Sequence, residues 1–95
     1  MRQLSWGQRA KRDLEKIQDF WLPEDPDFVG TLLTSILRSG RFLIETPGAG
    51  SPVDKSGLRK WRLARTPYLI FYRVSKHEVR IVRVRHEHEN WQPRP

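Results

Sequence analysis

The chain has 95 residues, of which 37% are hydrophobic, and it carries a formal net charge of +7. This length allows one modest core, so residues 1–95 are expected to form a single domain, with residues 92–95 as a flexible tail. The absence of cysteine excludes disulfides and thiolate metal sites, and no apolar run reaches the roughly 18–20 residues that a membrane span needs. The N-terminus lacks an apolar signal core, so the expected location is the cytoplasm.

The first half of the chain predicts a short strand followed by two helices. Residues 2–6 are expected to form the strand, and apolar residues then recur three and four positions apart on one helical face. That face consists of Ala10, Leu14, Ile17 and Trp21. Asp13 is expected to lie off this face, and Pro23 ends the helix.

A second helix is predicted next, because Asp25 is a capping carboxylate and Pro26 suits the first helical position. Its buried face is expected to comprise Val29, Leu32, Leu33, Ile36 and Leu37. The apolar pattern returns a heptad later, at Leu43 and Ile44. Gly40 is therefore expected inside the helix, and the Pro-, Gly- and Ser-rich residues 45–57 predict a loop.

Three short runs of β-branched and aromatic residues predict an antiparallel meander, at residues 58–63, 68–74 and 78–85. Both alternating sets of the middle run are apolar, so this strand is expected to be central and buried on both sides. The βααβββ order predicts a two-layer α+β domain, in which the antiparallel sheet packs on a two-helix hairpin. The opposite face of the sheet is left uncovered, so we expect a partner there or at a sheet edge.

Positive charge is concentrated in the predicted meander. Residues 55–95 contain eleven Lys and Arg against three Asp and Glu, whereas residues 1–54 contain seven against eight. The arginines of the meander are Arg59, Arg62, Arg65, Arg73, Arg80, Arg83 and Arg85. Each one alone is a solvated residue that protects a strand edge, but together they are expected to attract an acidic protein or nucleic acid.

Strict alternation along the last strand does not separate an apolar face from a charged one. One face is expected to hold Arg83 with Val79 and Ile81. The other is expected to hold Arg80 with Val82 and Val84. The alternation therefore does not say which arginines converge.

The last predicted strand is followed by a cluster of titratable residues, His86, Glu87, His88 and Glu89. One interpretation is an acid–base pair beside Arg83 and Arg85, and a second is a metal site, for which no third ligand is evident. The favoured interpretation is that His86 caps the strand while the other three residues are solvated. Trp61 is expected to pack in the core rather than stack on a base, and Trp91 to pin the C-terminus rather than contact a target.

The residues that carry a family resemblance are spread along the whole chain. They are Leu4-Ser5-Trp6 before a helix with Ala10, Asp13, Leu14 and Ile17, then Asp25-Pro26, Pro47, Gly50, residues 68–74, residues 81–86 and Trp91. In this order and spacing the chain resembles the RelE/ParE superfamily of bacterial toxins from type II toxin–antitoxin systems, and most of all its ParE branch. The resemblance implies the βααβββ fold, a cognate ParD-like antitoxin and an essential bacterial target. That target is DNA gyrase for ParE-like toxins, and mRNA on the ribosome for RelE-like toxins, which cut it.

The strand at residues 68–74 favours the ParE branch. RelE-like ribonucleases usually carry an arginine inside this strand, in a pattern like Y-R-L-V-Y, whereas this chain has Leu69 there. Leucine cannot stabilise the charge that develops on a phosphate during RNA cleavage. The usual terminal tyrosine is also missing, so we expect a toxin that binds gyrase rather than an enzyme. The alternative is a metal-independent endoribonuclease that uses Arg83, Arg85, His86 and His88.

Two contact surfaces are expected from the resemblance and the charge pattern. The target-binding residues are Arg59, Arg62, Arg65, Arg83, Arg85, His86 and Trp91. The antitoxin-binding residues are Leu14, Ile17, Trp21, Leu33, Arg73 and Arg80. No cofactor or metal is expected. Further alternatives are a toxin-like protein that has lost its toxicity and a plain nucleic-acid-binding domain, which predicts a DNA affinity that falls steeply with salt.

Overall fold

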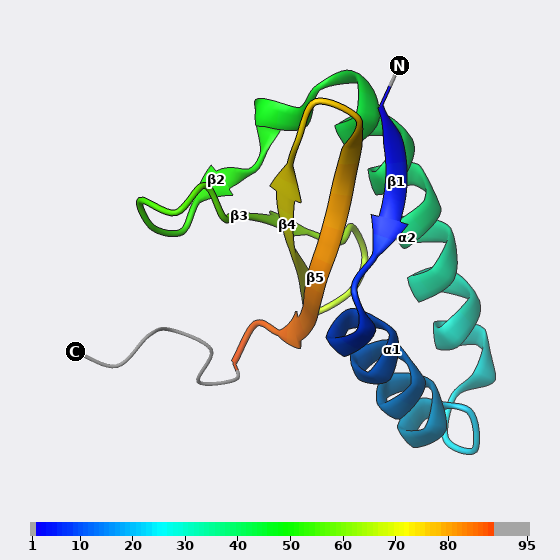
Figure 1. The fold of residues 1–95 in the computed structure, drawn as a ribbon. Coiled ribbons are helices and arrows are strands. Elements are labelled where there is room, and N and C mark those ends of the chain that lie inside the picture. The colour runs from blue at the N-terminus through cyan, green and yellow to red at the C-terminus, as the bar shows by residue number, and fades with distance from the viewer. Residues whose placement is uncertain (1, 89–95) are drawn as a thin grey trace.

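The structure, a computed structural model, describes residues 2–88 as two layers, with the helices on one face of a sheet (Figure 1). The elements in chain order are β1 Gln3–Trp6, α1 Gln8–Trp21, α2 Pro26–Glu45, the 3-10 turn η1 Pro47–Ala49, β2 Ser51–Pro52, β3 Arg59–Arg62, β4 Tyr68–Val74 and β5 Glu78–His86. The predicted α+β class and βααβββ order are confirmed, with β2 as a short addition inside the predicted loop. The expected tail at residues 92–95 lies outside the described residues. None of the described helices is long and apolar enough to cross a membrane.

The start and the packing of α2 follow from residues that the sequence marks. The side chain of Asp25 accepts a hydrogen bond from the backbone N–H of Phe28 at 3.1 Å, and Pro26 occupies the first turn. This cap satisfies one of the N–H groups that a helix leaves without an internal partner. Gly40 lies inside the helix, as predicted, and a Cβ atom there would stand 2.7 Å from Cδ2 of Leu4. Glycine therefore lets α2 approach β1 closely.

The buried face of α2 is narrower than the apolar pattern predicts. Its buried apolar residues are Val29, Leu32, Ile36, Gly40 and Leu43. Leu33 and Leu37, expected on the same face, are 37% and 62% exposed. α1 packs mainly on β5 and contacts α2 only slightly, so it does not cover this flank of α2. The predicted burial of Leu33 and Leu37 is therefore wrong.

The sheet is mixed rather than wholly antiparallel. Its strand order is β1-β5-β4-β3-β2, and β3, β4 and β5 form the predicted antiparallel meander. At one edge β1 pairs with β5 in parallel, and at the other edge β2 pairs with β3. The two helices carry the chain from one edge of the sheet to the other (Figure 1). Parallel strands need a long crossover of this kind, because a tight turn reverses the chain and can join only antiparallel strands.

A β-bulge in β5 decides which of its side chains face the helices. Phe71 pairs with Arg83 whereas Tyr72 pairs with Ile81, so Val82 is an extra residue in β5. The buried positions of this strand are consequently two and then three residues apart, at Val79, Ile81 and Val84. The strict alternation expected from the sequence is wrong beyond the bulge. Arg83 lies on the face opposite to Ile81, and Val84 returns to the core.

The core lies between the helices and one face of the sheet. Its fully buried side chains include Leu32, Leu43, Leu63, Ile70, Tyr72, Val79 and Ile81. β4 is the middle strand, and its apolar residues are largely buried on both faces, which confirms the prediction for residues 68–74. Trp61 packs against this core, donates its indole N–H to the hydroxyl of Ser39 at 3.2 Å and lies 5.3 Å from the ring of Phe42. Core packing of Trp61, the favoured interpretation, is thus confirmed.

Candidate functional site

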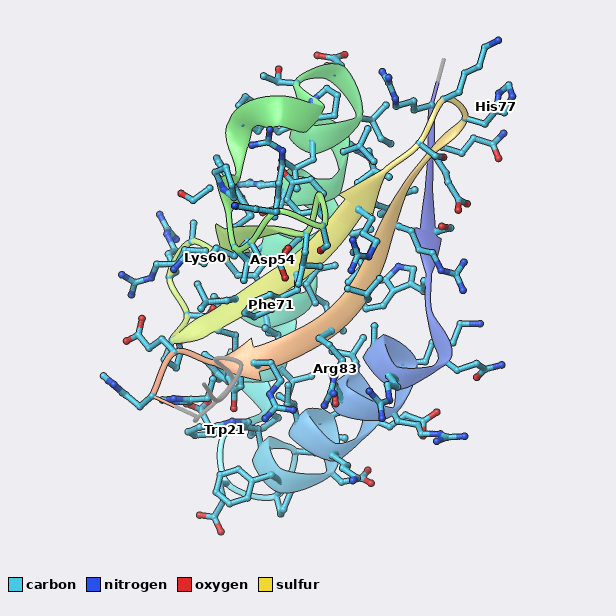
Figure 2. All side chains as sticks on the ribbon, turned by 60° about the vertical axis from the view of Figure 1, so that its left-hand side comes forward. Trp21, Asp54, Lys60, Phe71, His77 and Arg83 are labelled. Atoms are coloured by element: carbon cyan, nitrogen blue, oxygen red, sulfur yellow. The ribbon has the colours of Figure 1, made fainter. Side chains whose placement is uncertain are left out.

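The face of the sheet that α2 does not cover is strongly basic. Figure 2 looks onto this face, with Lys60, Phe71 and Arg83 lying across the strands and α2 passing behind them. The strand register places on it a set of cations that we call the basic face, namely Lys60, Arg62, Arg73, Arg80, Arg83 and Arg85. Lys60 and Arg83 flank Phe71, Arg62 and Arg85 flank Leu69, and Arg73 lies opposite Arg80.

Leu69 and Phe71 form an apolar floor beneath these cations. Phe71 is only 4% exposed although no helix covers this side of the sheet. Its neighbours in the ladder are Lys60 and Arg83, whose aliphatic stems are placed to cover the ring. The cations and the apolar floor thus form one layer on this side of the sheet.

Arg83 is held by a carboxylate from α1. Its Nε donates to Oδ2 of Asp13 at 2.8 Å and its Nη2 donates to Oδ1 at 3.1 Å. The backbone N–H of Val84 donates to the same Oδ2 at 3.0 Å. β1 ends opposite Ile81, so β5 has no strand partner on this edge at Val84. The Asp13 carboxylate accepts the Val84 N–H in place of a strand. This is a bidentate ion pair that joins α1 to β5, and the carboxylate offsets the charge of Arg83.

The remaining cations of the basic face differ in how firmly they are held. Arg62 lies 3.7 Å from a carboxylate oxygen of Glu87. Arg73 donates from Nη1 to the carbonyl of Ser56 at 2.8 Å. The hydrogen bonds of Ser56 lower the pKa of the Asp54 carboxyl, and the charge of Arg73 adds a smaller lowering. Arg80 is exposed, and its side chain makes no ion pair or hydrogen bond within residues 2–88.

Arg59, expected to contact the target, lies on the other face of the sheet. It pairs with Tyr72 and donates from Nη1 to the carbonyls of Gly50 at 2.7 Å and Gly48 at 3.3 Å. The Tyr72 hydroxyl accepts from the N–H of Gly50 at 2.9 Å and donates to the carbonyl of Pro47 at 2.8 Å. Burial raises the pKa of Tyr72 above its usual value of 10.0. Arg59 therefore braces the η1 loop and is not part of the basic face.

His86 lies on the helix side of the sheet, away from Arg83 and Arg85. It pairs with Tyr68, and the two rings meet edge to face with centroids 5.3 Å apart. Its Nδ1 accepts the N–H of His88 at 3.1 Å. The side chain of His88 is 81% exposed. The four residues expected to act in a ribonuclease are thus divided between two faces of β5 and the segment that follows it.

No metal cluster adds to this site in the part of the chain that the structure describes. Among residues 2–88 no group of three or more His, Asp or Glu is arranged to hold a metal ion. Glu89 and Trp91 lie outside the described residues.

The residues expected to bind an antitoxin do not form one surface. Leu14 and Ile17 pack against the core, and Trp21 donates its indole N–H to the Tyr68 hydroxyl at 2.9 Å. Leu33 is exposed on α2, whereas Arg73 and Arg80 belong to the basic face.

Sequence reasoning missed Lys60 as a member of the basic face and Asp13 as the anchor of Arg83. The signal for Asp13 was present in the sequence. It lies three residues after Ala10 and four before Ile17, so a helix turns it toward the packed side.

Known proteins are similar to this chain in both sequence and fold. The family described as "ParE toxin of type II toxin-antitoxin system, parDE" matches residues 4–91. A putative toxin, Y4kP, of Sinorhizobium fredii (strain NBRC 101917 / NGR234) is 33% identical over 90 residues, which make up 95% of this chain and 93% of the relative.

Two solved structures are similar as well. A chain from the chromosomal ParDE system of P. aeruginosa is 28% identical with a TM-score of 0.75, over 90% of this chain and 96% of that one. A YoeB/ParE toxin from Agrobacterium tumefaciens has the same fold, with a TM-score of 0.58 at 23% identity over 88% and 96% of the two chains. The expected RelE/ParE superfamily is thereby confirmed: the chain belongs to the ParE toxin family of type II toxin–antitoxin systems.

Proposed function

We propose that this toxin arrests bacterial growth by binding and poisoning DNA gyrase through its basic face, and that a cognate ParD-like antitoxin neutralises it. The basic face is the observation that carries the proposal. It is a continuous set of cations on three neighbouring strands, and no helix covers it. A complex of gyrase with DNA offers phosphates and acidic protein surface, and both attract such a field.

Binding, rather than chemistry by the toxin itself, is supported by how the candidate catalytic groups are placed. RNA cleavage without a metal needs a base, an acid and a cation gathered around one phosphate. Arg83 is engaged by Asp13, and His86 packs on Tyr68 on the other side of the sheet. Between Arg62 and Arg85 stands Leu69, which can stabilise no charge.

A cognate antitoxin is supported by the family, whose description names a type II toxin–antitoxin system. The similar P. aeruginosa chain belongs to a ParDE system. An acidic or amphipathic partner that covers the basic face would also mask the surface proposed to reach gyrase. Masking of this kind would neutralise the toxin without any change in its fold.

The second candidate is a RelE-like, ribosome-dependent mRNA endoribonuclease. One observation favours it: the rings of His86 and His88 lie 5.4 Å apart, next to the carboxylate of Glu87. Two imidazoles at this separation resemble an acid–base pair. On this account His86→Gln and His88→Gln abolish toxicity, whereas a gyrase poison tolerates both.

Inducible expression in a bacterial host separates these candidates. Gyrase poisoning predicts growth arrest with double-strand breaks and an induced DNA-damage response, while messages stay intact. Arrest with cut messages and unbroken chromosomes would instead support the ribonuclease. Normal growth would contradict both, and co-expression of the antitoxin should restore growth in either case.

A further inference from the structure

A groove of about 400 Å³ runs between α2 and the turn that joins β3 to β4. Its walls include Thr31, Thr34 and Arg38 from α2, and Ala64 and Arg65 from the turn. α2 covers the side of the sheet opposite to the basic face, so the groove and the basic face lie on different sides of the molecule. The groove is therefore a separate surface, with its own chemistry.

The groove carries two uncompensated charges. Arg38 on α2 and Arg65 on the turn both line it, and both residues are exposed. Neither side chain makes an ion pair or a hydrogen bond within residues 2–88. No Asp or Glu is among its lining residues, which otherwise are small and include Thr31, Thr34 and Ala64. Guanidinium groups pair readily with carboxylates, so a groove lined by one arginine from each wall suits an acidic side chain.

The backbone of Arg65 provides an independent reason to assign this side chain a role. Its φ angle is 66°, in the left-handed region that glycine or asparagine adopts at lower cost. The turn is held without the arginine side chain. The Thr66 hydroxyl donates to the carbonyl of Leu63 at 2.9 Å, and the N–H of Tyr68 donates to that hydroxyl at 3.0 Å. The turn therefore keeps an arginine at a position that glycine would occupy at lower cost, which favours a role for the side chain outside the fold itself.

We propose that this groove receives an acidic side chain of the antitoxin, clamped between Arg38 and Arg65. The inference rests on the proposed function, because it takes the antitoxin as the partner. α2 also exposes Leu33 and Leu37, so a partner segment that wraps around α2 would bury apolar surface as well as pair the two arginines. A groove of this volume fits a side chain, whereas a phosphate backbone needs a row of cations, which the basic face supplies.

Three variants of the full-length toxin test the inference against its cognate antitoxin. Arg38→Gln and Arg65→Gly each remove one guanidinium from the groove, and Arg12→Gln removes an exposed one from α1 as a matched control. We expect each groove variant to weaken antitoxin binding about tenfold in a titration near physiological salt, because a charged hydrogen bond is lost. Arg12→Gln should bind as the unaltered toxin does. Arg65→Gly should melt at the same temperature or higher, because glycine relieves the left-handed strain.

Unaltered antitoxin affinity in both groove variants, or an equal loss of affinity in Arg12→Gln, overturns the inference. Gyrase inhibition is measured separately, so the proposed function can hold even if this inference fails. Loss of duplex DNA binding in the groove variants with antitoxin binding intact also overturns it, and assigns the groove to phosphate. A decisive positive result is a charge swap, in which Arg38→Glu loses binding and one acidic-to-lysine change in the antitoxin restores it.

Discussion

Replacement of Asp13 by asparagine should destabilise the fold, because the carboxylate of Asp13 on α1 holds Arg83 of the basic face. Its carboxylate accepts two hydrogen bonds from Arg83 and one from the N–H of Val84. The side chains of Asp13 and Arg83 are 15% and 32% exposed, so their ion pair is partly shielded from water. Loss of charged hydrogen bonds in such a setting costs about 2–3 kcal/mol of unfolding free energy. In a chain of this length that lowers Tm by about 10 °C or more.

Thermal unfolding of Asp13→Asn, Arg83→Gln and the double variant measures this coupling. We expect the double variant to lose less stability than the two single losses added together, because each single change breaks the same pair. Asp19→Asn is the matched control, since Asp19 is an exposed acid of the same helix. Asp13→Asn should also lower toxicity, because it reduces the amount of folded protein, and Arg83→Gln should lower it at least as much because it also removes a cation of the basic face. An unchanged Tm in Asp13→Asn would refute this reasoning.

Three further predictions concern the basic face, a close packing contact and the η1 loop. Arg80→Glu should weaken gyrase inhibition without lowering Tm, because the side chain of Arg80 makes no ion pair or hydrogen bond within residues 2–88; equal inhibition in a supercoiling titration would contradict this. Gly40→Ala should destabilise by about 1–3 kcal/mol through its clash with Leu4, whereas Gly30→Ala, which meets nothing within 4 Å, should stabilise slightly; denaturant titrations compare the two. Tyr72→Phe should cost about 1–3 kcal/mol, because it leaves one buried and one partly buried backbone group without their hydrogen bonds to the hydroxyl. The raised pKa of Tyr72 means that its contribution is full below pH 10.0 and is lost as the pH rises through the higher pKa of the folded state; a pH series should show this loss in the unaltered chain and not in the variant.

Local chemistry made most of the fold predictable from the sequence. The Asp25 cap, the glycine inside α2 and the doubly apolar β4 each depend on neighbours within a few residues. The parallel pairing of β1 could not be predicted in the same way, because the direction of an edge strand depends on the crossover that the helices make. The exposure of Leu33 and Leu37 depends likewise on where α1 packs, which an apolar pattern does not encode.

The candidate site was predictable as a region but not in its details. The concentration of arginines in the meander correctly indicated a charged sheet face. The bulge at Val82 then decided which arginines share that face, and one inserted residue in a strand leaves no clear mark in the sequence. Charge alone also does not reveal the backbone carbonyls that engage Arg59 or the carboxylate that engages Arg83.

The central claim is that the basic face poisons gyrase. Its most direct test is a cleavage assay with purified gyrase, relaxed plasmid and ATP, to which the toxin or its Arg80→Glu variant is added. The account predicts that the toxin inhibits supercoiling and accumulates linear DNA bound to gyrase, that the variant does so only at higher concentration, and that added antitoxin abolishes both effects. Full supercoiling in the presence of the toxin would contradict the account. If the same toxin cuts mRNA on ribosomes, His86 and His88 become the candidate active site.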